Sequence, residues 1–441
     1  MGYGMVASLR WGPGGAISRM TEAERSDGHT LLLYAQDSKG MGHITRALTI
    51  ARHVLAAHPD SVAYITTESP ITGDFPLPAR CEFIPLPTHL SSGPLPKTEA
   101  QDELFNQHLS DNRARTLHDI ATGLAPDLVI VDHEPLGHKG EFRDGLFALK
   151  AKSPDTKFVF GMRDIMDDPV RIRAKWRALG VYDAFETLYD GIAVYGSPNL
   201  YDVAEAYAIP PSVHAKLHYC GFVVREHTAV DPQVLRHLYR VPRDGPLVVA
   251  TVGSGRDGYP VLGAVQGAIE RLQARRRDVR AILVTGPFMP EEQRAILQSR
   301  ATPTMRVVPR ADNFQLMAAA DAIVGMGGYN SVCEALSVAR PLVIVPRATH
   351  KVEQQIRAEI LASRGLARCV HPRDLSGENL AVALEWALSR DRADHARLVR
   401  EIVPSFDGAT RLTAYLDQWL GGNGQSGRFA FEGLSSAGSP S

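Results

Sequence analysis

The sequence lacks the signals of several protein classes. Its four cysteines lie far apart and none forms a C-x-x-C pair, which argues against a clustered metal or redox site and favours reduced thiols. No apolar run approaches the roughly 18–20 residues needed to cross a bilayer. Lysine and arginine total 48 against 49 acidic residues, so no excess of positive charge points to nucleic acid. We therefore expect a cytoplasmic protein with no transmembrane segment, nucleic-acid partner, metal or cofactor.

The two ends of the chain differ in composition from the rest. Residues 1–28 and 421–441 are rich in glycine and serine, and we expect both to be disordered. The first segment also carries glycine and proline where a secretory signal peptide needs an apolar core. Between them, 441 residues leave room for two domains. We expect an N-terminal domain at 29–225, a linker at 226–245 and a C-terminal domain at 246–420, whose last helix could cross back to the first.

Short apolar runs alternate with longer helical patterns along the chain. Nine of these runs are expected as strands: Leu31–Ala35, Val62–Thr66, Leu128–Asp132, Phe158–Met162, Ile192–Tyr195, Leu247–Val252, Ala281–Thr285, Ala322–Val324 and Leu342–Val345. A further short strand follows Gly365. Continuous apolar runs fit strands buried on both faces of a parallel sheet. The alternation therefore predicts an α/β fold of two Rossmann-like, doubly wound domains, with ligands in the cleft at the strand ends.

The most informative segment begins where the strand ending at Val324 runs into a glycine-rich turn. Gly325, Gly327 and Gly328 let the backbone come close to a ligand. A helix is expected to begin near Asn330 or Ser331, and its free amide groups would bind a diphosphate.

Glu334 lies one turn into that helix and could accept hydrogen bonds from both hydroxyls of a ribose. The alternative is a capping box, in which Ser331 caps the helix and Glu334 caps back. The three glycines favour the ligand-binding interpretation, because a plain cap does not need them.

Two other strand ends carry polar residues that could contact the same ligand. Ser254, Gly255 and Arg256 follow the strand at 247–252, and Arg256 could offset phosphate charge. The alternative is a simple turn with a solvated arginine. Glu353 and Gln354 open a helix after the strand at 342–345, where they would lie over the sugar, although glutamate also suits the first turn of any helix.

The N-terminal half has a matching glycine loop, which contains Gly40, Gly42 and His43. It is not a dinucleotide fingerprint, since Thr45 stands where the third glycine is required. His43 suits the role of a general base for an acceptor hydroxyl, or it is bonded to a backbone carbonyl at the helix start.

Further polar residues end two strands of this half. Asp132, His133 and Glu134 stand at the carboxyl end of one apolar strand. Asp132 could orient a base, or one of the three could be the base, although polar residues at such ends are also ordinary. Arg163 and Asp164 stand at a similar place on the next strand. Asp167-Asp168 ahead of Pro169 fits a helix cap better than a metal-binding pair.

The C-terminal segment resembles a known family. GGYNSVCE followed by P…EQQIRAEIL…G is similar to the donor-binding signature of GT-B glycosyltransferases, both the small-molecule glucosyltransferases and glycosyltransferase family 28, which includes the peptidoglycan-precursor N-acetylglucosaminyltransferases. The resemblance covers about 120 residues, and the whole chain resembles bacterial predicted glycosyltransferases. Met326 and Arg357 depart from this pattern, which has histidine and asparagine there.

The resemblance implies a role for each of these loops. Gly328, Asn330 and Ser331 would face the diphosphate, together with Gly327 and the loop at 254–256. Glu334 would hold the ribose, and Glu353 and Gln354 would contact the sugar hydroxyls. The loop at 40–43 would face the cleft from the acceptor side.

These observations together predict an enzyme that moves a hexosyl group, N-acetylglucosamine being one candidate, from a UDP-linked or similar nucleoside diphosphate sugar to an unidentified acceptor hydroxyl. We expect inversion at the anomeric carbon without a metal ion, and peripheral membrane contact if the acceptor is lipid-linked. Two alternatives stay open. A nucleotide-sugar 2-epimerase of the same fold would need no acceptor, and a non-catalytic nucleotide-sugar-binding protein would need no base.

Overall fold

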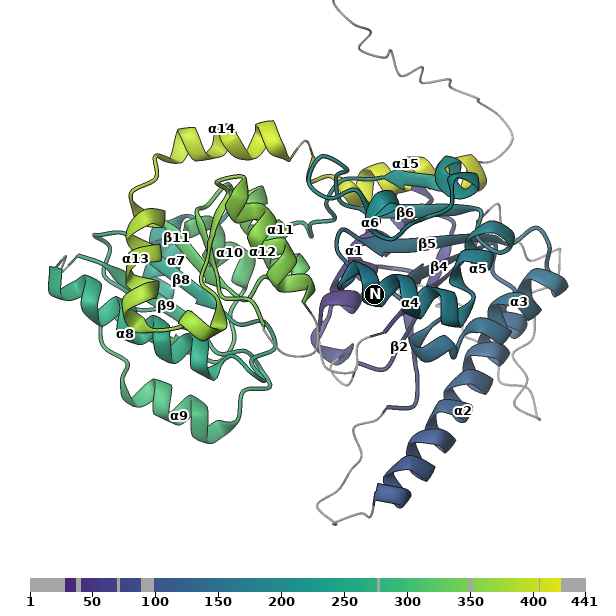
Figure 1. Ribbon diagram of the computed structural model, residues 1–441, viewed down its shortest axis with the longest axis horizontal. Coiled ribbons are helices and arrows are strands. Elements are labelled where there is room, and N and C mark those ends of the chain that lie inside the picture. The colour runs from purple at the N-terminus through teal and green to yellow at the C-terminus, as the bar shows by residue number, and fades with distance from the viewer. Residues whose placement is uncertain are drawn as a thin grey trace, which may run out of the picture.

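The computed structural model describes residues 28–36, 41–69, 72–88, 99–275, 278–347, 352–403 and 405–421. Gly40 and nearly all of the two terminal segments expected to be disordered lie outside these ranges. Figure 1 shows two α/β bodies side by side, each built around a twisted sheet. The α/β, Rossmann-like fold class expected from the sequence is confirmed.

The first body contains a sheet of seven parallel strands among the described residues, in the order β3-β2-β1-β4-β5-β6-β7. They are β1 (Thr30–Ala35), β2 (Val62–Thr67), β3 (Cys81–Pro85), β4 (Leu128–Asp132), β5 (Lys157–Arg163), β6 (Gly191–Tyr195) and β7 (Leu217–Tyr219). The register sets Ala35 of β1 opposite Asp132 of β4. The carboxyl ends of these strands therefore meet at one edge of the sheet.

The second body contains six parallel strands among the described residues, in the order β10-β9-β8-β11-β12-β13. They are β8 (Leu247–Thr251), β9 (Arg280–Val284), β10 (Met305–Val308), β11 (Ala322–Gly325), β12 (Leu342–Ile344) and β13 (Ala367–Cys369). All nine strands expected with bounds are present within two residues of them. The sequence missed β3, β7 and β10, each an edge strand whose residues are not continuously buried.

Helices cover both faces of each sheet. In the first body they are α1 (Gly42–Ala57), α2 (Glu99–Leu124), α3 (Arg143–Lys152), α4 (Pro169–Leu179), α5 (Val181–Thr187), α6 (Val203–Ala206) and the returning α15 (Gly408–Leu420). In the second they are α7 (Pro232–Leu238), α8 (Tyr259–Arg275), α9 (Glu291–Ser299), α10 (Asn313–Ala319), α11 (Tyr329–Ser337), α12 (Glu353–Ser363), α13 (Gly377–Leu388) and α14 (Arg392–Ile402). No helix of the described chain is long and apolar enough to cross a membrane.

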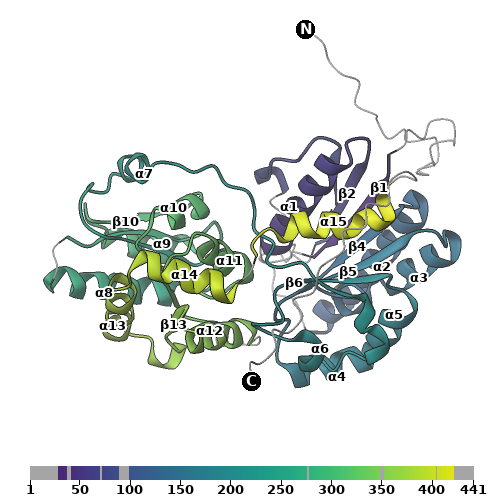
Figure 2. The same cartoon turned by 90° about the horizontal axis from the view of Figure 1, so that it is seen from above.

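Within the residues that the structure describes, the chain passes from one body to the other and later returns. It leaves the first after β7 and returns after α14, and α15 then packs against α1, as Figure 2 shows from above. The two crossings touch each other: Val223 and Asp407 form an isolated antiparallel bridge, and the Gly408 amide donates to the Phe222 carbonyl over 3.0 Å. One hydrophobic cluster runs through both bodies, from Leu33 of β1 to Val249 of β8.

Candidate functional site

The N-terminal half brings His43 and Asp132 into contact. His43 is the second residue of α1, and Asp132 ends β4, so both lie at the carboxyl edge of the first sheet. The His43 Nδ1 atom lies 2.7 Å from Asp132 Oδ2. When Nδ1 donates its proton to that carboxylate, Nε2 is the ring atom that can accept a proton. The pair therefore has the arrangement of a base and the residue that orients it.

Arg46, one turn further along α1, holds Asp132 in place. Its Nε and Nη2 atoms donate to the two carboxylate oxygens over 2.9 and 2.6 Å. Burial alone would raise the pKa of Asp132, but Arg46 and the hydrogen bond from His43 outweigh it and lower that pKa to about 2. Asp132 is therefore a fixed anion at neutral pH.

His133 and Arg163 continue this cluster. The His133 ring lies 4.8 Å from the His43 ring, centroid to centroid, and its Nε2 atom lies 3.3 Å from Arg163 Nη2. His133 has φ +72°, an uncommon conformation for a residue with a side chain and one that concentrates at functional sites. The backbone thus leaves the extended conformation directly after β4 ends.

The N-terminus of α11 is open in the second body. The helix begins at Tyr329, Gly328 is its N-cap, and no side chain caps it. A Cβ atom added to Gly328 would meet no atom within 4 Å, whereas one at Gly327, which has φ +82°, would come within 2.9 Å of the Ile344 side chain. Ser331 is thus the third helical residue. The alternative capping-box interpretation is wrong, because the helix starts earlier than the sequence suggested.

Glu334 is held by an arginine that the sequence did not identify. Arg225, from the first crossing segment, donates through Nε to Glu334 Oε1 over 2.7 Å and through Nη2 to Asp312 Oδ1 over 2.6 Å. Burial raises the pKa of Glu334, and Arg225 offsets part of that rise. Arg225 thus occupies one oxygen of this carboxylate, and a ribose diol bound by both oxygens would have to displace it.

The loop after β8 has two kinds of residue. Gly255 has φ +92°, and a Cβ atom there would lie 2.1 Å from the Thr285 carbonyl oxygen, so its glycine is required by packing. Ser254 is half-buried and Arg256 is exposed. Their proposed contact with phosphate stays a prediction.

At the start of α12, Glu353 and Gln354 are both buried. Gln354 Oε1 accepts from the Arg347 amide over 3.0 Å, whereas Glu353 Oε2 has no hydrogen-bond partner among the described residues. Arg357, one turn later, spans the two bodies: its Nε and Nη2 atoms donate to the two oxygens of Asp164 over 2.9 and 2.7 Å. The arginine that departs from the family pattern thus has a partner in the opposite domain.

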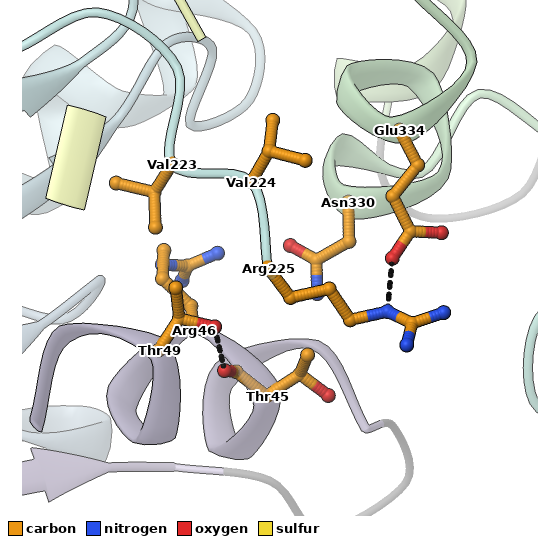
Figure 3. A pocket seen from close by; sticks show the side chains of 8 residues that line it. All are labelled: Thr45, Arg46, Thr49, Val223, Val224, Arg225, Asn330 and Glu334. Atoms are coloured by element: carbon orange, nitrogen blue, oxygen red, sulfur yellow. Dashed lines mark hydrogen bonds and ion pairs between the residues drawn. The ribbon is translucent and has the colours of Figure 1, made fainter. Parts of the chain in front are cut away.

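The two glycine loops meet in a closed interface. The Asn330 side-chain amide donates to the Gly42 carbonyl over 3.1 Å. Figure 3 shows Arg225 reaching from the crossing segment to Glu334, with Arg46 on the opposite side. The cavity between these side chains measures about 10 Å³, room for roughly one water molecule. A nucleotide sugar could bind there only after Arg225 moves and the domains part.

The sequence-derived site residues thus fall into two groups on facing domains. His43, Asp132, His133 and Gly42 lie on the first, whereas Asn330, Glu334, Glu353 and their neighbours lie on the second. Gly40 lies outside the described residues. The sequence did not assign roles to Arg46, Arg163, Asp164, Arg225, Asp312 and Arg357. Four of them have a positional signal, because Arg163 and Asp164 stand at a strand end and Arg46 and Arg357 lie one helical turn from a motif residue. Arg225 and Asp312 have no such signal. Asp168 caps α4 ahead of Pro169 as expected.

The similarity to known proteins is clearest in the C-terminal half of the chain. Residues 248–398 match the glycosyltransferase family 28 C-terminal domain. The chain is similar to an uncharacterized glycosyltransferase of Methanopyrus kandleri, with 26% identity over 43% of this chain and 52% of that protein, so it spans about half the length of this relative. It is also similar to a UDP-N-acetylglucosamine–N-acetylmuramyl-(pentapeptide) pyrophosphoryl-undecaprenol N-acetylglucosamine transferase of Desulfitobacterium hafniense, with 24% identity over 83% of this chain and 92% of that protein.

Solved structures show the same architecture. The calicheamicin glycosyltransferase superimposes with a TM-score of 0.62 at 18% identity, over 90% of this chain and 99% of that one. A UDP-glucosyltransferase from Polygonum tinctorium gives a TM-score of 0.62 at 16% identity, over 89% and 99%. These likenesses show the fold, which is GT-B. The family match confirms the enzyme class expected from the sequence, a glycosyltransferase.

Proposed function

Because residues 248–398 carry the C-terminal domain of glycosyltransferase family 28 on a GT-B fold, we propose that this glycosyltransferase moves a hexosyl group from a nucleoside diphosphate sugar to an acceptor hydroxyl. The observation that carries the proposal is the pairing of two half-sites. The uncapped start of α11 and the Glu334 carboxylate stand on one domain, and the His43–Asp132 pair stands on the domain that faces it.

The donor half of the proposal assigns the diphosphate to the amides that open α11. Their partial positive charge stabilises the leaving group without a metal ion, and Arg256 adds charge from the loop after β8. Glu334 accepts the ribose hydroxyls once Arg225 has released it. Glu353 and Gln354 contact the sugar, and the name of the Desulfitobacterium relative supports UDP-N-acetylglucosamine as the first donor to test.

The acceptor half assigns the base to His43. Its Nε2 atom takes the proton of the acceptor hydroxyl while the oxygen attacks the anomeric carbon, and Asp132 stabilises the imidazolium that forms. A single displacement of this kind inverts the anomeric centre. Incubation with UDP-N-acetylglucosamine alone separates this reaction from 2-epimerisation, because the epimerase would form the manno epimer without an acceptor.

We expect Glu334→Gln to weaken UDP binding by about 10- to 150-fold, since charged hydrogen bonds contribute about 1.5–3 kcal/mol each. Calorimetry with UDP, after a thermal-shift panel of UDP, GDP and dTDP and their sugars, measures the effect. Glu378→Gln, which removes an exposed carboxylate from α13 in the same domain, is the matched control. A wild-type dissociation constant for Glu334→Gln would remove Glu334 from the donor site.

The pH dependence of UDP binding gives an independent prediction. Burial raises the pKa of Glu334 above its ordinary value of 4.5, and only the ionised carboxylate can accept from both ribose hydroxyls. The wild type should therefore bind UDP more tightly than Glu334→Gln at neutral pH. As the pH falls, this difference in affinity should begin to shrink above pH 4.5. The ratio of the two dissociation constants across pH isolates this group from the titration of UDP itself. A ratio that stays constant through the acid range would contradict the assignment.

A further inference from the structure

Among the described residues three arginines are buried where the two domains meet, and one of them, Arg163, forms no ion pair. Arg46 and Arg357 each bind both oxygens of a carboxylate, Asp132 and Asp164 respectively. Arg163 is 9% exposed, yet it forms no ion pair within 4.0 Å among the described residues. Its Nε atom has no hydrogen-bond partner there. A buried cation in this state is strongly unfavourable unless an anion joins it.

The contacts that Arg163 does make are weak. Its Nη2 atom lies 3.3 Å from His133 Nε2 and 3.5 Å from the Met166 carbonyl oxygen. Burial lowers the pKa of Arg163, and the charges of Arg46 and Arg357 lower it further. The charges of Glu353 and Asp164 raise it, but not enough to prevent the pKa from falling below its ordinary value. Glu353 and Asp164 are therefore near enough to act on Arg163, but among the described residues neither forms an ion pair with it.

The position of Arg163 relates it to the acceptor side of the site. It ends β5, the strand next to the one that ends in Asp132, and the ring of its neighbour His133 lies tilted beside the ring of His43. The proposed diphosphate site at the start of α11 belongs to the other domain. An anion at Arg163 would thus stand next to the hydroxyl that His43 deprotonates, and it would enter when the domains part.

We propose that Arg163 binds an oxyanion of the acceptor, a phosphate or a carboxylate carried close to the hydroxyl that receives the sugar. This inference rests on the proposed function, because it names the class of acceptor used by the same site. A guanidinium matches either oxyanion with two parallel hydrogen bonds. It follows that the acceptor is an anionic molecule, and that a neutral analogue of it would bind poorly.

The test uses the full-length chain saturated with UDP, so that the diphosphate site is already filled. Inorganic phosphate, and sodium acetate in a parallel arm, are titrated at constant ionic strength, and the dissociation constant is measured by calorimetry. We expect saturable binding of at least one anion to the wild type, a loss of at least tenfold in Arg163→Gln, and an intermediate value in Arg163→Lys, which keeps the charge but not the fork. The stronger arm tells phosphate from carboxylate.

Arg177→Gln, which removes an exposed arginine from α4, should bind the anion like the wild type. Absence of saturable binding to the wild type, equal binding by Arg163→Gln, or phosphate that merely competes with UDP would each overturn the inference. If Arg163 served only to neutralise Glu353, Arg163→Gln would lower the unfolding temperature, Glu353→Gln would restore it, and anion binding would not change.

The two proposals fail separately in this design. Arg163 lies outside the proposed donor domain, so Arg163→Gln should bind UDP with the wild-type constant. If the wild type binds no nucleoside diphosphate, the proposed function is wrong. Titration with the anions in the absence of nucleotide would then decide whether Arg163 binds an oxyanion.

Discussion

Replacing His43 by alanine is expected to lower kcat by about 10²- to 10⁴-fold, the range that a positioned general base contributes. UDP binding should stay near the wild-type value, because His43 lies on the domain opposite Glu334. The measurement is the turnover of the donor, with water as the acceptor until the natural one is known, alongside the dissociation constant for UDP. A fall in kcat without a fall in affinity places the lost interaction in the transition state.

Two further variants sharpen this result. Asp132→Asn should also depress kcat, since it removes the charge that orients His43 and stabilises its protonated form. His53→Ala is the matched control, because His53 lies on the same helix and bonds the Thr49 carbonyl oxygen within it. If His43→Ala turned over donor at the wild-type rate, the base would have to be sought elsewhere in the interface.

Replacing Arg357 by methionine is expected to open the two domains. The change leaves Asp164 buried in the closed interface without its bidentate partner, a situation that costs about 3–5 kcal/mol. Parting of the domains lets water reach that carboxylate, so the equilibrium should shift toward the open form by a factor of about 10² or more. Small-angle X-ray scattering measures the change as a larger radius of gyration.

An exposed pair supplies the control for this experiment. Arg300 and Glu270 form an ion pair whose side chains are 43% and 51% exposed, and such pairs contribute little. Arg300→Gln should therefore leave the radius unchanged. If Arg357→Met unfolded at a lower temperature but kept the wild-type radius, the pair would stabilise the fold without holding the domains together.

The central strands could be predicted from the sequence, and the edge strands could not. β4 and β8 are buried on both faces, so the residues before their polar carboxyl ends, Asp132 and Thr251, are all apolar and the run is obvious. β3 and β10 lie at sheet edges, where partial exposure tolerates Glu82 and Arg306 and breaks the pattern. Among the described edge strands, β13 is the one that the sequence did predict. It was recognised because it follows a helical pattern that ends at Gly365.

The site was predictable where one short motif carries it. His43, Asp132 and Glu334 stood out because each follows a buried strand at a glycine-rich or polar turn. The charges that hold them did not stand out: Arg225 lies 109 residues from Glu334 in the sequence, and Arg357 lies 193 residues from Asp164. Partners at such separations become neighbours only when both sheets have formed and faced each other.

The helix start at Tyr329 shows how a local rule can mislead. Ser331 and Glu334 have the spacing of a capping box, but Gly327 takes a left-handed turn that only glycine adopts easily, and the helix begins two residues before Ser331. With no side chain over the helix end, the first amides are left for another group. The same shift directs Glu334 toward Arg225.

The paired crossings set the kind of motion that the two halves can make. The segments near Val223 and Asp407 are joined by backbone hydrogen bonds. We therefore expect the two segments to move together as one hinge. Such a hinge permits rotation of one domain about the hinge axis, but it resists translation and twisting of the domains relative to each other. The two domains should therefore close by the same rotation each time. His43 and Glu334 should return to the same relative position in every turnover.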